Sequence, residues 1–144
     1  MEREKEFFKA LDRIAYFLAK RDHSKQELQQ KLFGKFSEEA IQKAIDEAEE
    51  KNWILPPDEM SIKVTETLNL KRKGHLYIQN YLKKLGLPTT EMDDEREREK
   101  CLSLLESRYP NWQDLGYEEK QKPARFLQSR GFTLGIVKDV LFSL

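Results

Sequence analysis

The sequence predicts an all-α protein, an elongated, curved array of three tandem three-helix modules. Only 6 of its 144 residues are glycine and 5 are proline, which disfavours an all-β architecture. Hydrophobic residues make up 38%, which is little for one large core but enough for helices with one apolar stripe each. A unit of long helix, short helix and helix returns with a period of roughly 45 residues, as in stacked modules. A plain helical bundle would show the same stripes, and spacing alone favours the repeat only slightly.

The first module is expected over residues 1–55. Apolar side chains at helical spacing predict a helix from about residue 4 to residue 20. Ser24 and Glu27 then form an S-x-x-E capping box at the start of a short second helix. Ser37 is suited to cap the third helix, because serine side chains accept hydrogen bonds from exposed N–H groups of a first turn.

The second module is expected over residues 56–93. Pro57 suits the first position of a helix, since that position needs no N–H, and Gly86 suits the end of the following short helix. The next stretch is one helix from about Thr90 or a frayed turn joined to a helix. Whether Glu91–Lys100 is helical or a mobile joint stays open at this point.

The third module is expected over residues 94–144. Its first helix should stop at Pro110, because proline lacks the N–H that a helix interior requires. Pro123 fits only a first turn, which places the next helix at about residues 120–130. Apolar spacing predicts a closing helix over residues 133–142.

Basic residues gather at each of the three predicted modules, and stacking could bring them to one face that meets a polyanion or an acidic groove. For any single residue, a solvated surface position is the simpler interpretation. The strongest cluster is KRKGH, residues 71–75. The candidate basic face comprises Arg13, Lys20, Arg21 and Lys25 in the first module, Lys71, Arg72, Lys73, Lys83 and Lys84 in the second, and Arg108, Lys120, Lys122, Arg125 and Arg130 in the third.

No catalytic, cofactor or metal site is predicted. His23 and His75 lie in polar breaks, where a lone histidine is usually a surface residue, and no pair has metal-ligand spacing. Glycine-rich phosphate-binding motifs are absent from the sequence. The carboxylates of DDEREREK, residues 93–100, are expected to be exposed partners of neighbouring arginines. The sequence therefore favours a protein that is not an enzyme.

Four stretches of the sequence form a recognisable pattern: AYFLAKRDHSKQELQQKL (Ala15–Leu32), NWIL (Asn52–Leu55), KGHLYIQNYLKKLGL (Lys73–Leu87) and ARFLQSRGFTLGIVKDVL (Ala124–Leu141). In their order and spacing they resemble the RecX family of recombinase regulators. Departures lie at LPPDEM, where Pro56 and Pro57 replace the acidic residues usual in the family, and at Gln79, which follows Ile78 where relatives are often basic.

The resemblance implies a regulator, expected to be an inhibitor, of the RecA recombinase, with roles in DNA recombination, DNA repair and the SOS response. It implies binding in the groove of the RecA–single-stranded DNA filament and damping of ATPase, strand exchange and co-protease activity, with the DNA backbone as a further possible contact. Two alternatives stay open: a helical nucleic-acid-binding protein that acts without a recombinase, and a generic helical-repeat adaptor.

Charge and cysteine content agree with a protein of the cytoplasm. The chain has 26 basic and 26 acidic residues, so any basic face must come from segregation of charge. Its single cysteine, Cys101, excludes an intrachain disulfide and fits a reducing compartment. The longest apolar run, IAYFLA, is far shorter than the ~20 residues that span a bilayer. We expect a cytoplasmic monomer without membrane contact.

Overall fold

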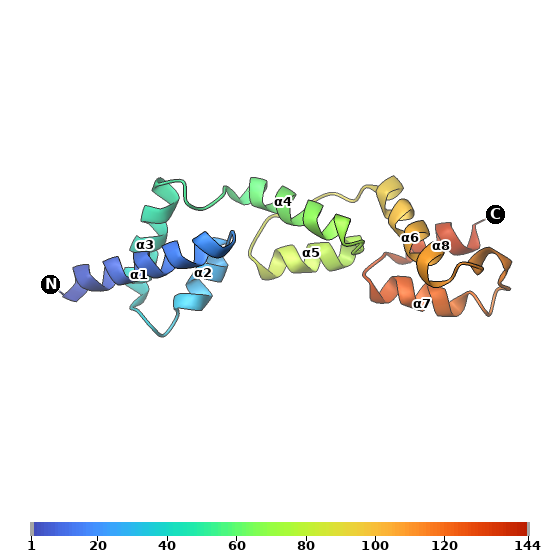
Figure 1. Cartoon of the computed structure of the whole chain (residues 1–144), viewed down its shortest axis with the longest axis horizontal. Helices are drawn as coiled ribbons and strands as arrows, with labels where there is room; N and C mark the ends of the chain where they lie inside the picture. Colours follow the sequence, from blue (N-terminus) through green and yellow to red (C-terminus); the bar gives the residue numbers. More distant parts are fainter. Residues whose placement is uncertain (1, 144) are drawn as a thin grey trace. The chain divides into compact units, whose positions relative to one another are not determined.

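The computed structural model describes residues 2–143, and within that range the chain is helical without a β-strand (Figure 1). The predicted all-α class and its tandem helical modules are confirmed. In chain order the elements are α1 (Glu2–Lys20), α2 (Lys25–Leu32), α3 (Glu38–Glu50), α4 (Pro57–Leu70), α5 (His75–Lys84), α6 (Asp94–Arg108), the 3-10 helix η1 (Trp112–Asp114), α7 (Gln121–Ser129) and α8 (Leu134–Phe142).

The first compact unit contains the chain up to Ser61 together with Lys84–Pro88. The capping box is present as predicted: Glu27 N–H donates to Ser24 Oγ at 3.1 Å, and Ser24 N–H donates to Glu27 Oε1 at 3.0 Å. Gln26 Nε2 donates to the carbonyl oxygen of Lys84 at 3.2 Å, which ties the 84–88 segment to α2. The buried core of α1, α2, α3 and the segment after α3 consists of Ala10, Ile14, Leu28, Leu32, Ile41, Ala44, Ile45, Ala48 and Ile54.

The second compact unit contains Ile62–Lys83 and the chain from Thr89 onward. Thr133 caps α8, since Ile136 N–H donates to its Oγ1 at 3.3 Å. Pro123 lies in the first turn of α7, as predicted. The buried core of α6, α7 and α8 consists of Cys101, Leu105, Ala124, Leu127, Phe132, Ile136, Val137 and Leu141.

Residues 89–93 are not helical, whereas Asp94–Lys100 belongs to α6, so of the two predicted alternatives the turn joined to a helix is found. Residues 56–93 hold two helices. Thr90 is held outside any helix by the buried side chain of Gln79: Thr90 N–H donates to Gln79 Oε1 at 2.7 Å, and Gln79 Nε2 donates to Thr90 Oγ1 at 2.9 Å. Helix α6 starts at Asp94 because Asp93 Oδ1 accepts the N–H of Arg96 at 3.1 Å. These side-chain bonds take the place of helical bonds at 89–93.

The prediction that His23 is a surface residue is wrong, since only 2% of it is exposed. Its Nε2 lies 3.1 Å from Lys31 Nζ, and its Nδ1 lies 2.9 Å from the carbonyl oxygen of Arg21. Because an ammonium can only donate, Nε2 accepts and the ring proton is on Nδ1. Burial lowers the pKa of His23 below its ordinary value of 6.5. The ring is a neutral core group.

Candidate interaction site at the 71–73 turn

The turn between α4 and α5, formed by Lys71, Arg72 and Lys73 and hereafter the 71–73 turn, is the strongest predicted basic cluster. Arg72 has φ +58°, in the left-handed region that glycine usually occupies. Arg72 N–H donates to the carbonyl oxygen of Asn69 at 2.9 Å, and Lys73 N–H donates to that of Leu68 at 3.0 Å. This pair of bonds is a Schellman motif, so the turn has a defined geometry despite lacking glycine at its strained position.

Arg130, predicted as part of the same basic face, is bonded to this turn. Its Nη2 donates to the carbonyl oxygens of Lys71 at 2.9 Å and Arg72 at 3.4 Å. A guanidinium is favourable there because the carbonyl end of a helix carries partial negative charge. The structure therefore brings Arg130 together with the 71–73 turn, and it gives Arg130 an internal hydrogen-bonding role.

Two glycines let the turn after the 71–73 turn approach the α7–α8 connection closely. Gly74 N–H donates to the carbonyl oxygen of Arg130, and Leu76 N–H donates to that of Gly131, both at 2.9 Å. A Cβ on Gly74 would lie 2.3 Å from the carbonyl carbon of Gly131. Gly131 has φ +97°, and a Cβ there would lie 2.6 Å from Cβ of Tyr77. The backbone before α5 therefore contacts the backbone of the α7–α8 connection directly. A side chain at Gly74 or Gly131 would push these two segments apart.

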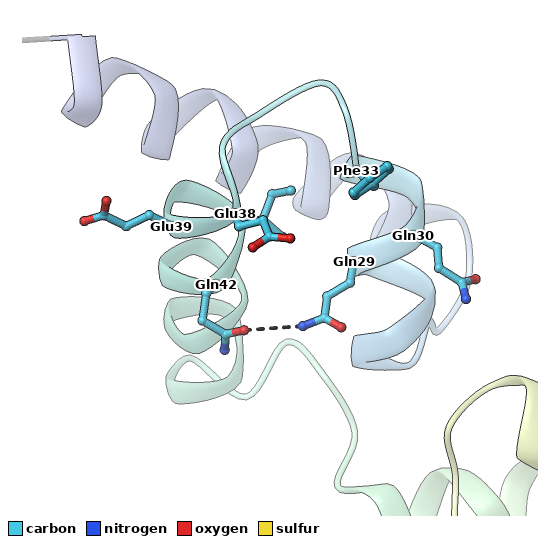
Figure 2. Close-up of a pocket in the computed structure, with 7 residues that line it drawn as sticks. Gln29, Gln30, Phe33, Glu38, Glu39 and Gln42 are labelled. Carbon is cyan, nitrogen blue, oxygen red and sulfur yellow. Dashed lines mark hydrogen bonds between the residues drawn. The ribbon is translucent and has the colours of Figure 1, made fainter.

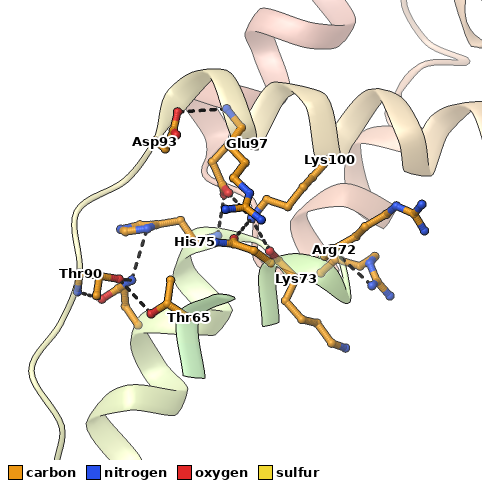
Figure 3. A network of polar contacts seen from close by, with 12 residues as sticks. Thr65, Arg72, Lys73, His75, Thr90, Asp93, Glu97 and Lys100 are labelled. Carbon is orange, nitrogen blue, oxygen red and sulfur yellow. Dashed lines mark hydrogen bonds and ion pairs between the residues drawn. The ribbon is translucent and has the colours of Figure 1, made fainter. Parts of the chain in front are cut away.

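A buried charged pair of α6 supports the turn from inside (Figure 3). Lys100 Nζ donates to the carbonyl oxygen of Lys73 and to Asn69 Oδ1, each at 2.7 Å, and forms an ion pair with Glu97. Glu97 Oε1 accepts the backbone N–H of His75 at 2.7 Å. Lys100 is 5% exposed and Glu97 4%. Both charges are compensated by partners, as burial requires.

The expectation that residues 93–100 expose all their charges is thus wrong for Glu97 and Lys100. Glu97, Cys101 and Leu105 follow one another at spacing of four, so Glu97 lies on the buried stripe of α6. That spacing was the available sequence signal. Arg96 does face outward and forms two 2.8 Å bonds to Glu66 on α4. The Arg96 hydrogen bond lowers the pKa of Glu66.

The basic residues predicted in the first unit form ion pairs or contacts with aromatic rings within that unit. Arg21 Nη2 bonds Glu27 Oε2 at 2.8 Å, and Lys25 pairs with Glu49. Arg13 and Lys20 lie over the ring of Tyr16, at 5.0 and 4.5 Å from its centroid. A hydrogen bond from Lys20 lowers the pKa of Tyr16.

The remaining predicted cations lie on α5, α6 and α7 or, for Lys120, directly before α7. Lys83 and Lys84 are exposed on the last turn of α5, and Lys122 and Arg125 are exposed on α7. Arg108 lies over the ring of Phe126 at 4.8 Å. Lys120 Nζ is half-buried and donates to the carbonyl oxygen of Leu141 at 2.8 Å, which is a structural contact.

Exposed apolar side chains next to the 71–73 turn were not singled out from the sequence. Leu70 is 72% exposed on the last turn of α4, and Tyr77 and Tyr81 are 38% and 39% exposed on α5. Lys73 Nζ lies 4.7 Å from the centroid of the Tyr77 ring. The available signal was the spacing of four between Tyr77 and Tyr81, which places them on one face of α5.

A groove of about 660 Å³ lies in the first unit between α2 and α3 (Figure 2). Phe33 and Ile41 contribute apolar surface, and Glu38 and Glu39 carry its charge. None of the predicted basic residues lines it.

The described part of the chain holds no cluster of three or more His, Cys, Asp or Glu side chains arranged to bind a metal ion. Among residues 2–143, every helix is too short or too polar to cross a membrane. Cys101 is buried, and burial raises the pKa of its thiol to about 12. A thiol in that state is a poor nucleophile, because the thiolate is the reactive form.

Family models and relatives agree on one family. A model described as the first three-helix domain of RecX matches residues 10–47, and one described as the third three-helix domain of RecX matches residues 94–141. The regulatory protein RecX of Actinobacillus pleuropneumoniae serotype 5b (strain L20) is 29% identical over 132 residues, which cover 87% of this chain and 85% of that protein. The regulatory protein RecX of Clostridioides difficile (strain 630) is 27% identical over 150 residues, which cover 96% of this chain and 69% of that protein.

Solved structures of RecX proteins are similar in fold. The crystal structure of RecX from Lactobacillus salivarius superposes with a TM-score of 0.79 at 19% identity, covering 95% of each chain. A second crystal structure, described as regulatory protein RecX, has a TM-score of 0.78 at 17% identity and covers 94% of this chain and 72% of that one. The two domain models together match more than half of the sequence, in the order expected of a RecX protein. The chain therefore belongs to the RecX family of regulatory proteins.

Proposed function

We propose that this protein inhibits the RecA recombinase by binding in the groove of the RecA–single-stranded DNA filament. Bound there, it damps ATP hydrolysis, strand exchange and co-protease activity. Family membership supports the target, and the 71–73 turn supports the place of contact. The protein acts in the cytoplasm as a monomer, and it is not an enzyme.

The main support for a contact with the filament at the 71–73 turn is that two of its cations are exposed and, within the described residues, unpaired on a turn of defined geometry. Lys71 and Arg72 are exposed, and among residues 2–143 neither side chain has an ion pair or a side-chain hydrogen bond. Their backbone is fixed by the Schellman bonds, by Arg130 and, through Lys73, by Lys100. Cations on a fixed backbone lose less conformational freedom on binding an acidic surface than cations on a mobile loop.

Tandem modules suit a filament because a filament repeats. If each module meets a neighbouring subunit or the DNA between subunits, the second contact forms at the high effective concentration that the first one creates. Contacts that are weak at each basic residue then add up to a high affinity for the filament. The predicted module boundaries, residues 1–55, 56–93 and 94–144, are part of this proposal.

The experiment reverses the charge of the turn and measures inhibition of the filament's ATPase. The variant Lys71→Glu/Arg72→Glu should need about tenfold more protein for half-inhibition, because attractive contacts become repulsive. The matched control is Lys5→Glu/Lys9→Glu, which makes the same charge change at exposed positions of α1. Equal inhibition by the turn variant and the unaltered protein, at equal helicity by circular dichroism, would remove the turn from the interface.

A further inference from the structure

One face of α5 presents two tyrosines next to the 71–73 turn. The Tyr77 and Tyr81 rings are nearly parallel, with planes at 16° and centroids 6.4 Å apart. More than a third of each residue is exposed. Lys73 lies in the turn before α5, with its Nζ 4.7 Å from the centroid of the Tyr77 ring. Two large aromatic side chains with this exposure and with nearly parallel rings form a platform on which planar groups can stack.

The platform is rigid because α5 is anchored at its start. Leu76 N–H is bonded to the carbonyl oxygen of Gly131, and Tyr77 backs directly onto that glycine. Tyr81 is then aligned by its neighbour Tyr77. A surface whose side chains are already ordered loses less entropy when a ligand binds.

The charged residues that flank the platform along the chain are basic. Helix α5, with the sequence HLYIQNYLKK, contains no acidic residue, and exposed Lys83 lies on its last turn. Lys71 and Arg72 precede it, while the nearest buried carboxylate, Glu97, is neutralised by Lys100. An apolar protein surface would use the rings but not the cations, and a bare polyanion would use the cations but not the rings. Single-stranded nucleic acid uses both, because bases stack on aromatic rings while phosphates meet lysine and arginine.

We propose that the free protein binds single-stranded nucleic acid on this platform, with unpaired bases stacked on Tyr77 and Tyr81 and adjacent phosphates held by Lys71, Arg72 and Lys73. The contact goes beyond recombinase inhibition, since it requires no recombinase. Duplex DNA binds more weakly, because its bases are stacked on one another and do not present free faces to the rings.

The test measures binding of a fluorescein-labelled oligothymidylate of about 15 nucleotides by fluorescence anisotropy, long enough for such a site. Tyr81→Ala should weaken binding about tenfold, the usual scale for loss of one stacked base. Tyr81→Phe, which keeps the ring, should bind like the unaltered protein. Tyr81 is the better position for this test, because Tyr77 also packs on Gly131 and its replacement would disturb the fold as well. The matched control is Tyr117→Ala, which removes an exposed tyrosine from the loop before α7.

The proposal is overturned if Tyr81→Ala binds as tightly as the unaltered protein, or if Tyr117→Ala weakens binding as much. It is also overturned if duplex of equal length binds as well as the single strand, or if the single strand is not bound at all. ATPase inhibition measured on the same proteins separates this result from the recombinase proposal. Inhibition without binding of free single strands leaves the recombinase proposal standing and removes this one.

Discussion

At the scale of single residues, Arg72 combines an unfavourable backbone conformation with an exposed charge. A residue other than glycine in the left-handed region is destabilised by about 1–2 kcal/mol, whereas glycine would lose about 0.5–1 kcal/mol through its greater freedom in the unfolded chain. The arginine is therefore not the most stable choice at φ +58°. Strain of this kind, next to Lys71, is consistent with a side chain retained for binding.

We predict that Arg72→Gly raises the free energy of unfolding by about 0.5–1 kcal/mol while weakening inhibition of RecA filaments. Urea denaturation and the filament ATPase measure the two effects. Asn52→Gly is the matched control: Asn52 has φ +60° at the end of α3, but asparagine tolerates this region better, so the gain should be smaller. A loss of stability in Arg72→Gly would contradict the account of the turn.

His23 makes stability depend on pH. Burial lowers its pKa in the folded protein, so the unfolded chain binds the proton more readily. The stability that neutral His23 contributes is complete above its unfolded pKa of about 6.5 and is lost as pH falls through the lower folded value. His75 shifts in the same direction through burial.

The expected result is a lower urea midpoint at pH 5.5 than at pH 7.5, with a smaller difference in His23→Gln. The same measurement is made on His75→Gln and on the double variant His75→Gln/His23→Gln. Comparing their pH-dependent urea midpoints shows whether the effect of His23 is independent of His75. A pH dependence that is unchanged by removing His23 would refute the proposed burial of a neutral ring.

At the scale of elements, the buried pair Glu97 and Lys100 fixes α6 to the 71–73 turn. We predict that Lys100→Met lowers the free energy of unfolding by about 3 kcal/mol, because Glu97 is left buried without its partner. The double variant Glu97→Gln/Lys100→Met should lose less than the sum of the two single variants, since the pair is coupled. Arg98→Met, which removes the exposed pair with Asp139, should change stability by less than about 1 kcal/mol. Strict additivity of the first two changes would show that the pair is not coupled.

The crossing of Gly74 and Gly131 gives a second prediction for elements. Gly74→Ala should destabilise the protein by about 2–3 kcal/mol, because the added Cβ would meet the carbonyl group of Gly131. Gly135→Ala should instead stabilise it by about 0.5–1 kcal/mol, since Gly135 lies inside α8 with open space around its Cβ position. Thermal unfolding of the two variants compares the same chemical change in opposite settings. Tolerance of alanine at residue 74 would argue against the close backbone approach.

At the scale of the whole molecule, helix positions were predictable because caps and apolar spacing are local. Ser24 with Glu27, Ser37 and Pro57 mark the same helix starts in sequence and structure. The cap of α6 by Asp93 is local as well. The non-helical conformation at Thr90, in contrast, was not predictable from local signals alone, because its bond partner Gln79 lies on α5, outside the segment. The same reason hid the burial of His23, which depends on Lys31 and the packed ring of Phe17.

The candidate site was predictable in part. Lys71, Arg72 and Lys73 stood out as a cluster of charge, but their support by Arg130 and Lys100 required the fold. Charge alone also could not separate Lys71 and Arg72, which are available, from Arg21 and Lys25, which are paired with acidic neighbours. The elongation and curvature expected from the sequence stay predictions, which small-angle X-ray scattering of the protein measures.

The most direct test of the regulatory role is the rate of ATP hydrolysis by RecA on single-stranded DNA as the unaltered protein is added. The account predicts that the rate falls in a saturable way and that the protein sediments with the filaments. An unchanged rate, with the protein left in the supernatant while RecA filaments pellet, would contradict it.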